Sequence, residues 1–116
     1  MCDESKDNCD VEQASISIRF VNLHTSKIEE RFIGFSPLEI PNAESISNAI
    51  LEKLSKSGLS IKNCRAQTYD GASVMSGCHN GVQSKIKQLQ KKAIYIHCFS
   101  HVLNLCVMAG VDNVYI

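Results

Sequence analysis

The chain has 116 residues, the size of one small domain, and its 44% hydrophobic and 21% charged residues are typical of a folded globular protein rather than a disordered one. Its 12 basic and 12 acidic residues give a formal net charge of zero, which excludes a strongly basic field over the whole domain. No secretory signal and no apolar run of about 18 residues is visible, so we expect neither a secreted protein nor a membrane-bound one. In that context the six cysteines do not indicate disulfides.

Two strands are predicted near the start of the chain. Residues 14–21 (ASISIRFV) have an apolar side chain at every second position from Ile16 to Phe20, which is the pattern of a half-buried strand. After the polar turn NLHTS, residues 27–35 (KIEERFIGF) form its predicted antiparallel partner. A first strand before Asp3 would have no room, so we expect that strand to be missing and Asp3 to be poorly held.

A helix and a further strand follow. Pro41 separates the hairpin from a predicted helix over 43–57, for which Asn42 is a suitable N-cap and Gly58 a suitable stop. Residues 59–67 (LSIKNCRAQ) are predicted to form the next strand, which leads into Asp70.

The last part of the chain alternates helix and strand. An amphipathic helix is predicted over 81–92, a brief apolar strand over 93–98 and a helix over 100–110. Because this last helix is apolar nearly all round, we expect it to be buried. The order of the elements predicts an α/β fold with a mixed sheet and flanking helices.

The dipeptide Asp70-Gly71 stands where a predicted strand ends. In open α/β sheets, functional side chains gather at the carboxyl ends of strands, although a lone Asp before Gly is most often a turn residue. A site for Mg²⁺ needs a second carboxylate, and the acidic start of the chain offers candidates. If a strand carrying Asp3 ran beside the strand that ends at Asp70, the two carboxylates would be neighbours.

Three blocks of sequence, CDESKDNCDVEQASISIRFV, CRAQTYDGASVMSGCHNGVQSKIKQL and AIYIHCFSHVLNLCV, together resemble the transposase domain of the hAT superfamily. The likeness is greatest to the animal proteins descended from it, namely the zinc finger MYM-type 1-like proteins and the repressors of the inhibitor of the protein kinase. The resemblance implies a ribonuclease H-like fold, in which three acids hold Mg²⁺ or Mn²⁺ and DNA strands are cut and joined.

The resemblance assigns roles to four residues. Asp3 in DES matches the first catalytic acid of the family, and Asp70 in YDGAS matches the second. Cys98 and His101 match its supporting Cys-x-x-His element. The third acid, a Glu on a later helix, has no counterpart, so residues 1–116 are expected to form a partial domain without the first strand and the C-terminal catalytic region.

The expected function is that of a fragment of a metal-dependent DNA strand-transfer enzyme, inactive as an isolated chain. DNA is the ancestral partner that the resemblance implies, and nuclear localisation rests on the family only. Four lysines are candidate phosphate contacts, although a solvated helix face is the more common explanation of such a pattern. They are Lys85, Lys87, Lys91 and Lys92.

Three alternatives remain open. The first is a domesticated, non-catalytic scaffold for nuclear protein partners. The second is a small zinc-stabilised domain built by Cys64, Cys78, Cys98 and His101, although these residues do not form the two spaced pairs typical of zinc sites. The third is a Cys-His nucleophile, for which neither an oxyanion hole nor an orienting acid is indicated. No membrane partner or small-molecule substrate is expected.

Overall fold

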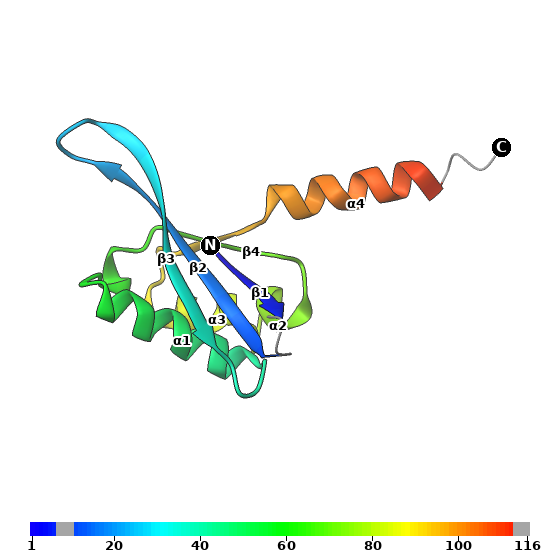
Figure 1. The fold of residues 1–116 in the computed structure, drawn as a ribbon, viewed down its shortest axis with the longest axis horizontal. Helices are drawn as coiled ribbons and strands as arrows, with labels where there is room; N and C mark the ends of the chain where they lie inside the picture. The colour runs from blue at the N-terminus through cyan, green and yellow to red at the C-terminus, as the bar shows by residue number, and fades with distance from the viewer. Residues whose placement is uncertain (7–10, 113–116) are drawn as a thin grey trace.

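The computed structural model describes residues 1–6 and 11–112 (Figure 1). Its elements in chain order are β1 (Cys2–Lys6), β2 (Glu12–Asn22), β3 (Lys27–Pro37), α1 (Ala43–Lys56), the 3₁₀ helix η1 (Ile61–Asn63), β4 (Ala66–Tyr69), α2 (Ser73–Ser76), α3 (Val82–Leu89), β5 (Ile94–His97) and α4 (Phe99–Asp112). The predicted α/β fold class is confirmed.

The strands form two small sheets. The first has the order β1-β2-β3 and is antiparallel throughout, and the second is the parallel pair β4-β5. Strand β1 also contacts β4, so the outer edge of the first sheet faces the second sheet. The predicted hairpin over 14–21 and 27–35 is therefore present, and a bulge at Ile33 shifts its register.

The expectation that the first strand would be missing is wrong. Residues Cys2–Lys6 form β1, which pairs with β2 in a register that sets Asp3 opposite Ser15. The ladder continues to the first residue, because the Met1 amino group donates to the Ser17 carbonyl at 2.9 Å and the Ser17 N–H donates to the Met1 carbonyl at 3.0 Å. The edge of β2 supplies partners that the short segment cannot provide for itself.

Helix α1 begins and ends as its capping residues predict. The Ser45 N–H donates to Asn42 Oδ1 at 2.9 Å, which satisfies one of the unpaired donors of the first turn. Beyond the last turn, Gly58 has a φ of +72°, a conformation that suits glycine. The helix packs against β2 and β3 and also contacts α3.

The core lies where α1, α3 and the sheets meet. Its fully buried large side chains are Ile46, Met75, Val82 and Ile86. An ion pair of 2.5 Å between Lys85 of α3 and Glu44 of α1 links the two helices at the surface.

The strand predicted over 59–67 is mostly a different structure. Residues Ile61–Asn63 form η1, in which the Lys62 N–H donates to the Ser60 hydroxyl at 3.3 Å, and β4 begins only at Ala66. This local cap competes with strand pairing, as serine side chains commonly do. The strand still ends directly before Asp70.

The prediction that the last helix is buried is also wrong. In Figure 1, α4 extends away from the rest of the molecule. The side chains of Phe99 and Leu103 are 80% and 65% exposed. The apolar composition of this helix indicates a preference for an apolar environment. The described residues do not supply one. No helix in the described part of the chain is long and apolar enough to cross a membrane.

Candidate functional site

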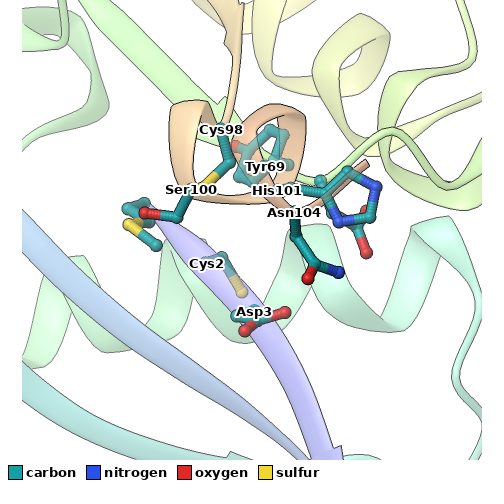
Figure 2. Close-up of a pocket in the computed structure, with 9 residues that line it drawn as sticks. Cys2, Asp3, Tyr69, Cys98, Ser100, His101 and Asn104 are labelled. Atoms are coloured by element: carbon teal, nitrogen blue, oxygen red, sulfur yellow. The ribbon is translucent and has the colours of Figure 1, made fainter. Parts of the chain in front are cut away.

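A pocket of about 290 Å³ lies where β1, the end of β4 and the start of α4 meet (Figure 2). It brings together residues from the three sequence blocks described above. Its lining consists of Met1, Cys2, Asp3, Tyr69, Asp70, Cys98, Ser100, His101 and Asn104. All four residues to which the resemblance assigns roles therefore line one pocket.

Asp3 is held in place by the strand that the sequence did not predict. Its backbone carbonyl accepts a hydrogen bond from the Ser15 hydroxyl at 3.1 Å, and its Oδ1 accepts from the Glu4 N–H at 3.0 Å. The side chain itself is exposed. The carboxylate is thus fixed by backbone pairing and remains accessible to a ligand from the pocket side.

Asp70 forms a turn and contributes to the pocket at the same time. Its Oδ1 accepts from the Ala72 N–H at 3.0 Å, the hydrogen bond of an Asx-turn, as the turn-residue interpretation requires. The Tyr95 hydroxyl donates to the Asp70 backbone carbonyl at 2.9 Å. Burial, and then the electrostatic effects of Asp70 and Cys98, raise the pKa of Tyr95, which keeps this hydroxyl protonated as a donor.

The residue that follows Asp70 in the sequence must be small. A Cβ atom on Gly71 would lie 2.7 Å from Cε1 and 3.0 Å from Nε2 of His97, the last residue of β5. The ring of His97 in turn lies 5.2 Å from that of His101, measured between centroids. Its Nε2 is buried and has no hydrogen-bond partner among the described residues. This contact connects the Asp70 turn with the start of α4.

Glu4 adds negative charge near the pocket. Its pKa is raised, first by burial and then by the charges of Asp70, Glu12 and Asp3. The sequence reasoning did not select Glu4, because the resemblance matches Asp3 and no strand was predicted around these two residues. The raised pKa indicates that carboxylates on β1 and at the end of β4 interact electrostatically.

Helix α4 contributes the polar residues Ser100, His101 and Asn104 to the pocket, and Figure 2 shows them at the helix start above β1. Sequence reasoning missed Ser100 and Asn104. A signal was available, since these three are the noncysteine polar residues of an otherwise apolar stretch over 99–111 and their spacing places them on one side of a helix.

The donor set of the pocket fits a hydrated Mg²⁺ or Mn²⁺ better than it fits a closed metal cage. Asp3 and Asp70 offer the carboxylate oxygens that such cations prefer, and water would have to complete the coordination. Among residues 1–6 and 11–112, no group of three His, Cys, Asp or Glu side chains is placed to hold a metal ion. Burial raises the pKa of the Cys2 thiol to about 12, so this residue is a neutral wall of the pocket.

The other predicted residues lie elsewhere. Cys64 donates through Sγ to the Ala66 carbonyl at 3.1 Å, and Cys78 is exposed in the loop before α3, so neither lines the pocket with Cys98 and His101.

The four lysines also lie outside the pocket. The side chain of Lys85 forms the ion pair with Glu44, whereas Lys87, Lys91 and Lys92 are exposed. Lys91 and Lys92 precede the start of β5, at the end of the β4-β5 pair opposite Asp70.

A mixed α/β fold with aspartates from the first strand and from the end of β4 in one pocket is the arrangement expected of a transposon-derived, RNase-like domain. A family model described as "ZMYM1/FAM200, RNase-like domain" matches residues 1–81, and the chain belongs to this family. The predicted transposon-derived family and RNase-like fold are thereby confirmed.

A curated relative adds a match over nearly the whole chain. The human protein "52 kDa repressor of the inhibitor of the protein kinase" is 31% identical over 110 residues, which cover 94% of this chain. The chain spans only 14% of that relative's length. No solved structure matches.

Proposed function

We propose that the pocket between β1 and β4 binds a divalent cation, Mg²⁺ or Mn²⁺, at a site inherited from an enzyme that cut and joined DNA strands. The observation that carries the proposal is that Asp3 and Asp70, which are distant in sequence, line the same pocket. The pKa of the neighbouring Glu4 is raised first by burial and then by the charges of Asp70, Glu12 and Asp3, and this second contribution supports the proposal, because neighbouring carboxylates that disfavour ionisation also favour a bound cation.

The roles of the residues follow from their positions. Asp3 and Asp70 would supply the two carboxylate ligands, and Tyr95 and Gly71 would hold the Asp70 turn in place. In a complete site, a bound metal ion activates the attacking oxygen and stabilises charge on the phosphate. His101 and Asn104 would line the space in which a phosphate lies.

Catalysis by the isolated chain is not part of the proposal. The chain carries the matches to two of the family's acids and lacks the third, so the cation would be bound without the geometry that strand cleavage needs. We therefore propose weak binding of the cation and no nuclease activity. DNA as a partner, and residence in the nucleus, belong to the same proposal through the family.

The test is a calorimetric titration of the purified chain with Mn²⁺ and with Mg²⁺. Asp70→Asn removes the carboxylate charge while leaving an oxygen for the turn hydrogen bond, so it should abolish binding without unfolding the chain. Glu39→Gln removes an exposed carboxylate that does not line the pocket, so it serves as the matched control. Equal binding by the wild type and Asp70→Asn would contradict the proposal.

A second candidate is the non-catalytic scaffold. One observation favours it, namely that the described residues contain no group of three side chains placed to hold a metal. In such a scaffold, Asp70 would need only to form the hydrogen bond of its turn. Absence of Mn²⁺ binding by the wild type, with the fold intact by circular dichroism, would favour this function over the cation site.

A further inference from the structure

The basic residues of the chain are unevenly distributed. Residues 53–111 contain eight lysines and arginines and a single acidic residue, Asp70, whereas residues 1–52 contain ten acidic residues and four basic ones. The formal net charge of zero therefore conceals two halves of opposite sign. Since a surface of one charge attracts partners of the other, the place where the basic side chains gather is informative.

Two short segments of the basic half, residues 59–65 and 89–92, lie together at the end of the β4-β5 pair opposite Asp70. The Ile94 N–H donates to the Arg65 carbonyl at 3.1 Å, so the residues before β5 lie beside those before β4. The side chain of Gln90 joins the two segments, because its Oε1 accepts from the Lys92 N–H at 3.1 Å and its Nε2 donates to the Lys62 carbonyl. We call these two segments the basic end.

The cationic side chains of the basic end are exposed, and none of them forms an ion pair with another described residue. They are Lys62, Arg65, Lys91 and Lys92. By contrast, Lys56 pairs with Glu52 at 2.6 Å and Lys85 pairs with Glu44 at 2.5 Å. Much of the positive charge that the described residues leave without a carboxylate is therefore found at the basic end.

Arg65 is held in a defined orientation. Its Nη1 donates to the carbonyls of Lys62 and Cys64 at 3.2 Å and 3.1 Å. These bonds leave the Nε–Nη2 edge of the guanidinium for an acceptor from outside the described residues. Two parallel N–H groups on such an edge fit the two oxygens of a carboxylate.

Exposed aliphatic side chains lie on the same two segments. Leu59 comes directly before the cap of η1 and Leu89 ends α3, and they are 41% and 57% exposed. An aliphatic side chain is stabilised by burial against apolar groups of a peptide, which a phosphate backbone does not offer. Neither segment contains an aromatic residue on which a nucleic-acid base could stack.

We propose that the basic end binds an acidic segment of a partner protein in which aliphatic residues are interspersed among Asp and Glu. The carboxylates would pair with the four cations, one of them with the free edge of Arg65, and the aliphatic side chains would cover Leu59 and Leu89. No residue of the basic end lines the pocket, so this surface goes beyond the cation site and does not depend on it.

The first test is fluorescence anisotropy of a labelled synthetic peptide of glutamate and leucine in a three-to-one ratio, titrated with the full 116-residue chain. We expect binding that weakens as salt is added, because the exposed charges are then screened. The same peptide with serine in place of leucine should bind more weakly, since it leaves Leu59 and Leu89 uncovered. A DNA duplex with the same number of charges should also bind more weakly than the leucine peptide.

The second test places the binding surface by substitution. Lys62→Gln and Lys92→Gln each remove one charge but keep the backbone groups that Gln90 contacts, so each should weaken binding about threefold. Lys27→Gln is the matched control, since Lys27 is exposed at the start of β3, and it should leave binding unchanged. Circular dichroism verifies that the variants are folded.

A further pair of variants tests the aliphatic contribution. Leu89→Ser should reduce the difference in affinity between the leucine peptide and the serine peptide. Leu23→Ser should leave that difference unchanged, because Leu23 is 89% exposed but lies in the turn between β2 and β3.

Three results would overturn the proposal. Absence of binding to the leucine peptide would show that the basic end does not take an acidic segment. Tighter binding of the DNA duplex than of the leucine peptide would assign the surface to a phosphate backbone instead. Equal weakening by Lys27→Gln and Lys92→Gln would mean that the attraction is not specific to this surface.

Discussion

Gly71 lies against the imidazole of His97, so closely that a Cβ atom at position 71 would be 2.7 Å from the ring. This contact joins the turn after β4 to the end of β5, since Gly71 follows Asp70 and His97 ends β5. The absence of a side chain at position 71 therefore sets how closely the Asp70 turn approaches β5.

We expect Gly71→Ala to destabilise the chain by about 1–3 kcal/mol, the usual cost of forcing an extra group into a packed contact. Chemical denaturation measures the change. His97→Ala removes the obstructing ring. The double variant Gly71→Ala/His97→Ala should therefore lose less stability than the sum of the losses in the two single variants. Strict additivity would show that the two residues do not oppose each other.

A second close contact is between the backbones of two glycines, Gly77 and Gly81. A Cβ on Gly81 would lie 2.5 Å from the nitrogen and 2.6 Å from the oxygen of Gly77, where no flexible side chain can move away. We expect Gly81→Ala to cost more than about 2 kcal/mol and to disturb the start of α3, as measured by thermal unfolding and hydrogen exchange.

Gly58→Ala is the comparison for this second glycine. Gly58 has a positive φ but nothing within 4 Å of the added Cβ. The loss of stability in Gly58→Ala should therefore stay near the cost of the unfavourable backbone conformation, about 1–2 kcal/mol. A Gly81→Ala variant as stable as the wild type would show that the loop relaxes freely.

Parts of this fold could be predicted because the signals are local. The alternation around Ile16 indicates β2, and the side chain of Asn42 does cap α1. The end of a strand at Asp70 was also predicted from neighbouring residues. In each case the residues that determine the structure lie within one element and its immediate flanks.

The errors concern features that depend on distant partners. Strand β1 exists because the edge of β2 pairs with it, and the short segment itself contains no clear alternation. The burial of α4 was predicted from its composition, which indicates what a helix needs and not whether the chain provides it. The contact between Gly71 and His97 joins two strand ends, and nothing in the spacing of the sequence indicates it.

The electrostatics around Glu4 predict a pH dependence of stability. The pKa of Glu4 is raised above its ordinary value of 4.5 by burial, then by Asp70, Glu12 and Asp3. The folded state therefore binds this proton more tightly than the unfolded state does, and stability falls as the pH rises from below 4.5 through the raised folded value. Glu4→Gln should remove this fall.

Urea denaturation of the wild type and Glu4→Gln between pH 4 and pH 7 measures the difference. Relative to the wild type, the variant should gain stability as the pH rises through this window. Glu39→Gln removes an exposed negative charge outside the pocket and should leave the pH dependence of the wild type in place. A difference that grows towards low pH would contradict the assigned sign.

The N-cap of α1 gives a prediction that is independent of the pocket. Asn42→Ala removes the acceptor of the Ser45 N–H and should cost about 1 kcal/mol, since that donor then lacks its side-chain partner. Asn48→Ala changes the same residue type at an exposed position inside the helix, where alanine is the better helix former, and should be neutral or slightly stabilising. Equal losses for the two variants in thermal unfolding would show that the cap contributes nothing specific.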